Sequence, residues 1–112
     1  MGAVEVNESA VGKFKDYRDA FQQLQEWDTY ENGHDPYSGG IYNCDSPRLM
    51  EEHPRYKSKK FYAWKDDILS IACKKDCFCI ELKGSALKRM KGNRYKGRRG
   101  IKAFIFFGIA PY

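Results

Sequence analysis

The sequence lacks any apolar run close to the roughly 20 residues that a bilayer-spanning helix needs. Its first residues also lack the apolar stretch of a secretory signal peptide. We therefore expect a protein of the cytoplasm that has no membrane partner. In that reducing compartment cysteines are expected to remain free thiols. The four cysteines are Cys44, Cys73, Cys77 and Cys79.

A catalytic constellation is also missing. His34 is followed by Asp35, a pair that could supply a base and the group that orients it, but no nucleophile stands at a recognisable spacing. Asp35 is better explained as a hydrogen-bonding residue of its own turn, with His34 holding the loop against the preceding helix. The sequence therefore predicts a non-enzymatic protein with no catalytic residue and no cofactor.

Aromatic residues are plentiful, with eight Tyr, seven Phe and two Trp among 112 residues. Each of them buries a large apolar area, so a compact core is feasible without disulfides or a metal. A chain of this length is the usual size of one domain and too short for two independent cores. We expect a single domain over residues 1–112.

The clearest predicted element is an amphipathic helix over residues 16–32. Asp16 fits the N-cap, and Gly33 fits the position after the helix where the chain turns left-handed. Apolar residues recur in this segment at the i, i+3, i+4, i+7 spacing of a helix. They are Tyr17, Ala20, Phe21, Leu24 and Trp27, and we expect all of them in the core.

The remaining pattern predicts an antiparallel sheet. Alternation favours a strand over residues 3–11, and two apolar runs, 68–73 and 77–83, are typical of a hairpin. Residues 101–109 are apolar on both faces and indicate a central strand. Residues 45–60 contain two prolines and are expected to form a loop, with one helical turn near residues 49–52.

A short helix capped by Ser85 is predicted to run to about Lys91 and to stop at Gly92. A loop rich in glycine follows it. The fold class is thus α+β: an antiparallel sheet of about four strands, one main amphipathic helix packed on a face, and a short second helix.

Acidic residues are absent from residues 83–102, which hold nine basic residues. Outside this segment, the eleven other basic residues are outnumbered by the fifteen acidic residues. The charge of the chain is therefore bipolar, with a basic segment and an acidic remainder. This basic segment should attract polyanions, and Gly92, Gly97 and Gly100 would let backbone N–H groups approach phosphates. Its alternative role is that of a solvated, lysine-rich loop. The predicted binding residues for a protein or nucleic-acid partner are Lys83, Lys88, Arg89, Lys91, Arg94, Tyr95, Lys96, Arg98, Arg99 and Lys102.

Two further motifs leave alternatives open. Cys73, Cys77 and Cys79 would converge across the predicted hairpin and could bind zinc, but their C-x3-C-x-C spacing differs from the usual C-x2-C knuckle. Buried free thiols are the favoured interpretation. Residues 94–101 are similar to the [QR]-x-x-G-x-[GA] loop with which acetyltransferases hold the CoA pyrophosphate, although Arg99 replaces the second small residue.

Three groups of residues carry a resemblance to a known family. They are Met1-Gly2-Ala3, the turn G-H-D-P-Y-S-G-G-I over residues 33–41, and the end F-I-F-F-G-I-A over residues 104–110. Together they resemble small uncharacterised bacteriophage and prophage proteins with a G-H-x-x-Y-[ST]-G-x-I turn and a C-terminal F-F-G-x-A strand. The resemblance implies a viral protein, acting in the host cell cytoplasm, with a compact α+β fold.

By analogy, small phage proteins without catalytic residues most often bind a host protein and block or redirect it. We therefore expect a protein–protein interaction with a host protein or ribonucleoprotein complex that handles nucleic acid. Such a protein would be an inhibitor of host defence, for example of the anti-CRISPR type, and its basic segment would make the contact. The alternatives are a direct DNA- or RNA-binding module and a small CoA-dependent acetyltransferase-like protein.

Overall fold

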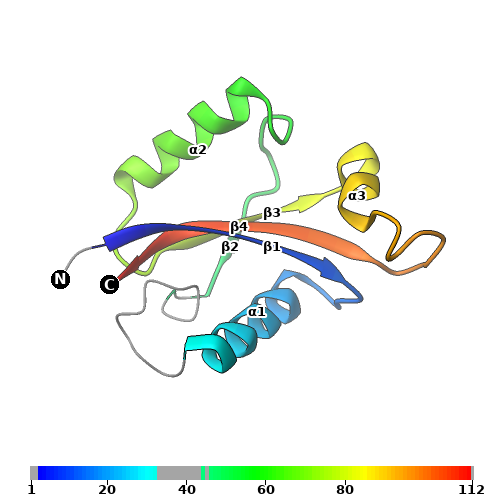
Figure 1. Ribbon diagram of the computed structural model, residues 1–112. Coiled ribbons are helices and arrows are strands. Elements are labelled where there is room, and N and C mark those ends of the chain that lie inside the picture. The colour runs from blue at the N-terminus through cyan, green and yellow to red at the C-terminus, as the bar shows by residue number, and fades with distance from the viewer. Residues whose placement is uncertain (1–2, 33–43, 45, 112) are drawn as a thin grey trace.

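The computed structural model describes residues 3–32, 44 and 46–111, with side chains described for residues 4–27, 44 and 46–110. One four-stranded sheet with the strand order β1-β4-β3-β2 organises these residues (Figure 1). The elements are β1 (Ala3–Gly12), α1 (Tyr17–Asn32), β2 (Arg48–Leu49), α2 (Lys59–Ile71), β3 (Cys77–Leu82), α3 (Gly84–Lys91) and β4 (Lys102–Pro111). The predicted α+β class and the number of strands are confirmed. The sheet is mixed, because β2 pairs with β3 in parallel while β4 is antiparallel to both of its neighbours.

Strand β4 is the centre of the sheet, as its apolar character on both faces predicts. Phe104 and Phe106 point towards α1 and belong to the core on that side, whereas Ile105 and Phe107 belong to the core on the other side. All four are almost fully buried. Helices cover both faces of the sheet, with α1 on one side and α2 and α3 on the other (Figure 1). The main amphipathic helix therefore packs on one face as expected, and the second face is covered as the apolar character of β4 indicates.

Helix α1 begins where the sequence predicts. The Asp16 side chain accepts a hydrogen bond from the Asp19 backbone N–H at 3.0 Å, and Asp19 accepts one from the Lys15 N–H at 3.0 Å. This reciprocal arrangement satisfies backbone donors at the helix start. Ala20 and Phe21 are buried against the sheet, but Trp27 is 63% exposed, so its predicted place in the core is wrong. Gly33, the predicted stop, lies outside the described residues.

Helix α2 is the element that the sequence interpretation missed. Residues 68–71, predicted as a strand, form its last turn, so the proposed hairpin with residues 77–83 does not exist. Ser58 caps the helix: its hydroxyl accepts from the Phe61 N–H at 3.1 Å and donates to the Arg55 carbonyl at 2.6 Å. Phe61 is buried and its ring lies 5.7 Å from that of Trp64, which packs against Phe107 at 5.8 Å.

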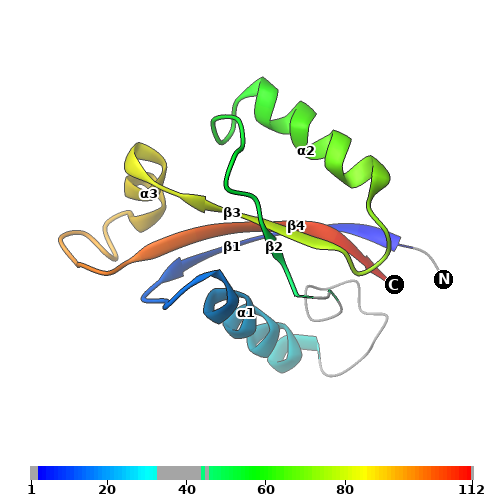
Figure 2. The same ribbon diagram turned by 180° about the vertical axis from the view of Figure 1, so that it is seen from behind.

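The segment before α2 passes round the β3 edge of the sheet. Figure 2 shows residues 46–58 crossing this edge from the α1 side to the α2 side. The predicted helical turn near residues 49–52 is replaced by the short strand β2, which pairs with Phe78 and Cys79. The Met50 N–H donates to the Cys79 carbonyl at 2.8 Å and extends this pairing by one bond.

Helix α3 and the loop after it follow the sequence prediction, except at the cap. The residue at the N-cap is Lys83, which makes no side-chain capping bond, so Ser85 does not serve as the cap. Gly92 ends the helix with a φ of 53°, a value that glycine adopts without steric cost. None of the helices in the described part of the chain is long and apolar enough to cross a bilayer.

Candidate functional site

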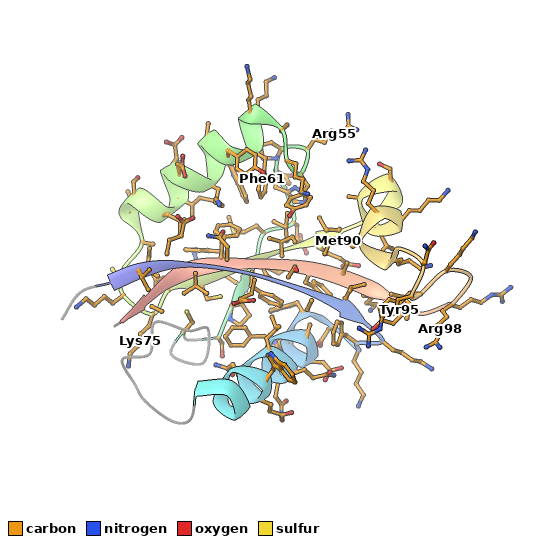
Figure 3. All side chains as sticks on the ribbon, in the orientation of Figure 1. Arg55, Phe61, Lys75, Met90, Tyr95 and Arg98 are labelled. Carbon is orange, nitrogen blue, oxygen red and sulfur yellow. The ribbon has the colours of Figure 1, made fainter. Side chains whose placement is uncertain are left out.

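The basic segment, residues 83–102, forms one end of the molecule. It comprises Lys83 at the N-cap of α3, helix α3 itself, the following loop and the first residue of β4. In Figure 3 Tyr95 and Arg98 lie at this end, and Lys75, on the turn before β3, lies at the opposite end. The cations that are adjacent in sequence are therefore also gathered in space.

The cations of this end are not ion-paired with described carboxylates, although Glu51 and Glu81 lie beside Lys83 and Arg89. By contrast, Lys65 on α2 pairs with Glu5 on β1 at 3.3 Å. Seven of the nine are exposed, and Lys91 and Lys102 are half-buried. These two have local roles, because Lys91 Nζ donates to the Arg98 carbonyl at 3.1 Å and Lys102 Nζ donates to the Lys15 carbonyl at 2.8 Å.

Some of the charge also stabilises α3. Lys88, Arg89 and Lys91 stand in its last turn, where cations interact favourably with the helix dipole, each by about 0.3–1 kcal/mol. This contribution accounts for three cations on the helix. It does not account for Arg94, Arg98 and Arg99, which lie in the loop beyond the helix.

Helix α3 separates the cations into two sides. On one side a groove of about 650 Å³ is bordered by Lys88, Lys91 and Lys96. Gly84, Gly92 and Gly97 also border it, and of these the Gly92 N–H already donates to the Lys88 carbonyl at 3.3 Å. Backbone N–H groups without covering side chains are accessible to an anion.

The other side of α3 faces the segment that leads into α2 across a cleft of about 500 Å³, which we call the α2–α3 cleft. Lys83 and Arg89 of the basic segment line it, and so do Arg55 and Lys57 from the loop before α2. The sequence interpretation missed Arg55 and Lys57, because about thirty residues separate them from α3. The available signal was two cations flanking Tyr56 directly after Pro54.

Tyr95, a predicted partner residue, is half-buried. The Arg94 guanidinium lies over its ring, 5.2 Å from the centroid. One face of the ring is therefore already covered by a cation, which leaves less of it available for stacking on a nucleic-acid base. Arg94 itself remains exposed.

The three cysteines of the alternative zinc site do not come together. Cys73 is exposed beyond the end of α2, whereas Cys77 and Cys79 are buried on the α1 side of the sheet. A hydrogen bond with Cys44, followed by burial, raises the pKa of the Cys77 thiol. Burial, with the charge of Glu81, raises the pKa of Cys79 to about 12. Within the described residues no group of three or more His, Cys, Asp and Glu side chains could hold a metal ion.

The loop similar to a CoA-binding loop leads into a strand. Residues 94–100 follow the C-terminus of α3 and precede β4. The described chain thus continues from this loop into a strand and not into a helix N-terminus, the feature that phosphate-binding loops use. His34 and Asp35 lie outside the described residues.

Comparisons with known proteins identify no relative of this chain. No family model, no curated protein and no solved structure matches the chain.

Proposed function

We propose that this chain is a non-enzymatic bacteriophage protein that binds a host nucleic-acid-handling complex and blocks or redirects it. It would act in the host cytoplasm as an inhibitor of defence, for example of the anti-CRISPR type. The observation that carries the proposal is the basic segment, with nine cations and no acid at one end of the molecule. The phage origin comes from the resemblance of residues 33–41 and 104–110 to phage sequences.

Charge density is the physical basis of this interaction. Cations gathered on one face create a potential that attracts a partner of opposite charge and raises the rate of encounter. Proteins that handle nucleic acid offer two such partners, namely the bound nucleic acid and acidic surfaces of the protein itself. An inhibitor that occupies the acidic surface needs no catalytic group.

Direct binding to nucleic acid is the alternative function, and the groove bordered by Lys88, Lys91 and Lys96 favours it. Three lysines beside exposed glycine backbone suit a phosphate chain. This alternative predicts steep salt dependence, because every phosphate contact releases a counterion.

A pull-down before and after nuclease treatment separates the two functions. The chain is attached through its N-terminus, because Ala3 lies at the end of the molecule away from the loop of the basic segment (Figure 1). The charge-reversed variant is Arg98→Glu/Arg99→Glu. The matched control is Lys74→Glu/Lys75→Glu, which changes the net charge equally at the opposite end.

We expect wild type and the control to retain one protein partner from a nuclease-treated bacterial lysate, and the Arg98→Glu/Arg99→Glu variant to lose it. Retention that disappears with the nucleic acid would establish the alternative function. A partner held equally by all three proteins would refute the role of the basic segment. Circular dichroism of both variants verifies that the fold is kept.

A further inference from the structure

The α2–α3 cleft combines an apolar floor with a charged rim. Its inner surface includes Leu49, Met50, Leu82, Ala86 and Met90, which come from β2 and the residue after it, the end of β3, and α3. Figure 3 shows Met90 on the side of α3 that faces α2, with Arg55 beside the loop across the gap. A volume of about 500 Å³ lies within the range of sites that bury a ligand group.

Two methionines give this floor a particular property. Met50 and Met90 approach the cleft from different elements, and both are half-buried rather than locked in the core. Unbranched thioether side chains adapt to apolar groups of different shapes, and methionines are used for this purpose at binding surfaces. The cleft is thus suited to a large aliphatic or aromatic side chain.

Cations surround this floor. Arg55, Lys57, Lys83 and Arg89 line the cleft, and all four are exposed. None of them is ion-paired with a described carboxylate. Lys83 and Arg89 also belong to the basic segment, so the cleft shares two cations with it.

The rim also carries Glu51 and Glu81. A nucleic-acid strand has a charge at every nucleotide, so its phosphates would meet these two carboxylates as well as the cations. A peptide can place acidic residues beside the cations and uncharged residues beside the carboxylates. The mixed rim therefore favours a peptide over a phosphate backbone.

We infer that the α2–α3 cleft is the anchor pocket for a partner protein segment in which a large apolar side chain stands between acidic residues. The inference rests on the proposed function, since the same partner covers the basic segment. The apolar anchor gives affinity in a desolvated pocket, and the surrounding carboxylates fix the register on the cations.

Methyl NMR tests this directly, because the chain has three methionines and two of them line the cleft. Protein labelled at the methionine methyl carbons is titrated with two blocked hexapeptides. One has two leucines between pairs of glutamates, and the other has two serines in their place. We expect the leucine peptide to shift the Met50 and Met90 signals and to bind about tenfold more tightly than the serine peptide.

Two variants place the effect in the cleft. Ser85→Trp adds a bulky side chain at an exposed position on the cleft wall, and Ser70→Trp adds the same side chain on an exposed position of α2 away from it. The first should abolish the preference for the leucine peptide, and the second should leave it unchanged. Equal loss in both variants would contradict the anchor pocket.

Other outcomes separate this inference from the proposed function. If the peptides bind equally and leave Met50 and Met90 unshifted, the anchor pocket is refuted while the basic segment keeps its role. If a single-stranded oligonucleotide shifts both methyl signals and the leucine peptide does not, the occupant is a nucleic-acid base and the inference fails. If the leucine peptide behaves as expected but the lysate yields no nuclease-resistant partner, the proposed function fails and the pocket stands.

Discussion

At the scale of single residues, Gly108 lies where β4 passes closest to the turn before β3. A Cβ atom on Gly108 would collide with the Asp76 carbonyl oxygen and lie 2.9 Å from the Cys77 Cα. Neither atom can move away easily, because the Ile109 N–H holds that carbonyl at 2.9 Å and Cys77 pairs with Gly108 in the sheet. We expect Gly108→Ala to lower the free energy of unfolding by about 3 kcal/mol, the upper range for overpacking.

Gly12→Ala in β1 is the control for Gly108. Its added Cβ would meet the Phe14 ring at 3.2 Å, and a side chain can shift where a backbone cannot. Urea denaturation should show a loss below about 1 kcal/mol for Gly12→Ala. Equal losses for the two variants would mean that the turn at Asp76 does not hold β4 as closely as described.

The thiols give a second test at this scale. At pH 8 Cys79, with its pKa raised to about 12, stays protonated, and the raised pKa of Cys77 has the same effect. Protonated, buried thiols react slowly, because the thiolate is the nucleophile. Cys44 is buried as well, so we expect a disulfide reagent to modify one thiol in the folded protein, the exposed Cys73, and all four after denaturation. Rapid modification that persists in Cys73→Ser would contradict this assignment.

At the scale of elements, α1 buries Phe21 but leaves Trp27 exposed, although the helical period predicts both in the core. Phe21 is 5% exposed and its ring lies 5.6 Å from that of Phe106, whereas Trp27 is 63% exposed. Phe21→Ala should therefore destabilise the protein by about 3 kcal/mol or more, as truncation of a buried aromatic does. Trp27→Ala should cost less than about 1 kcal/mol. Thermal melts of both variants compare them, and the reverse order would place Trp27 in the core.

The start of α2 can be tested through its cap. Ser58 satisfies the Phe61 N–H, so Ser58→Ala should lower stability by about 1 kcal/mol. Ser85 stands inside the first turn of α3 and makes no capping bond there, so Ser85→Ala should change stability by less than half of that amount. Denaturant titrations of the two variants decide between these roles. A larger effect at Ser85 would restore it as a helix cap.

A helix or strand is predicted correctly from the sequence where its pattern of apolar residues fits only one type of secondary structure. The apolar run of β4 on both faces, the alternation in β1 and the period of α1 give correct elements, and Gly92 correctly ends α3. Helix α2 is missed because Ile68, Leu69 and Ile71 are adjacent apolar residues that also fit a strand. Its helical period depends on Phe61 and Trp64, which lie in a four-residue uncharged run flanked by charged residues.

The basic segment is visible in the sequence because its cations are contiguous, whereas the α2–α3 cleft is not. The cleft brings Arg55 and Lys57 to Lys83 and Arg89, and this arrangement requires the chain to pass round the β3 edge before α2. Local patterns contain no information about such a crossing. Surface sites composed of distant segments therefore need the structure.

At the scale of the whole molecule, position matters more than net charge. The molecule measures 45 Å along its longest axis, and the Debye length at physiological salt is about 8 Å. A polyanion bound to the basic segment is therefore screened from charges at the far end, where Lys74 and Lys75 lie on the turn before β3. The net charge of +5 underestimates the attraction at the basic end, because the acids lie elsewhere in the chain.

Elution from a heparin column tests this with purified protein alone. The variants Arg98→Glu/Arg99→Glu and Lys74→Glu/Lys75→Glu have the same net charge, so a difference between them reports where the charge lies. We expect the first to elute at clearly lower salt than wild type, because it replaces attraction by repulsion within the basic segment. The second should elute close to wild type. Equal shifts of both variants would show that heparin responds to net charge, and the basic segment would then lose its distinction as a binding surface.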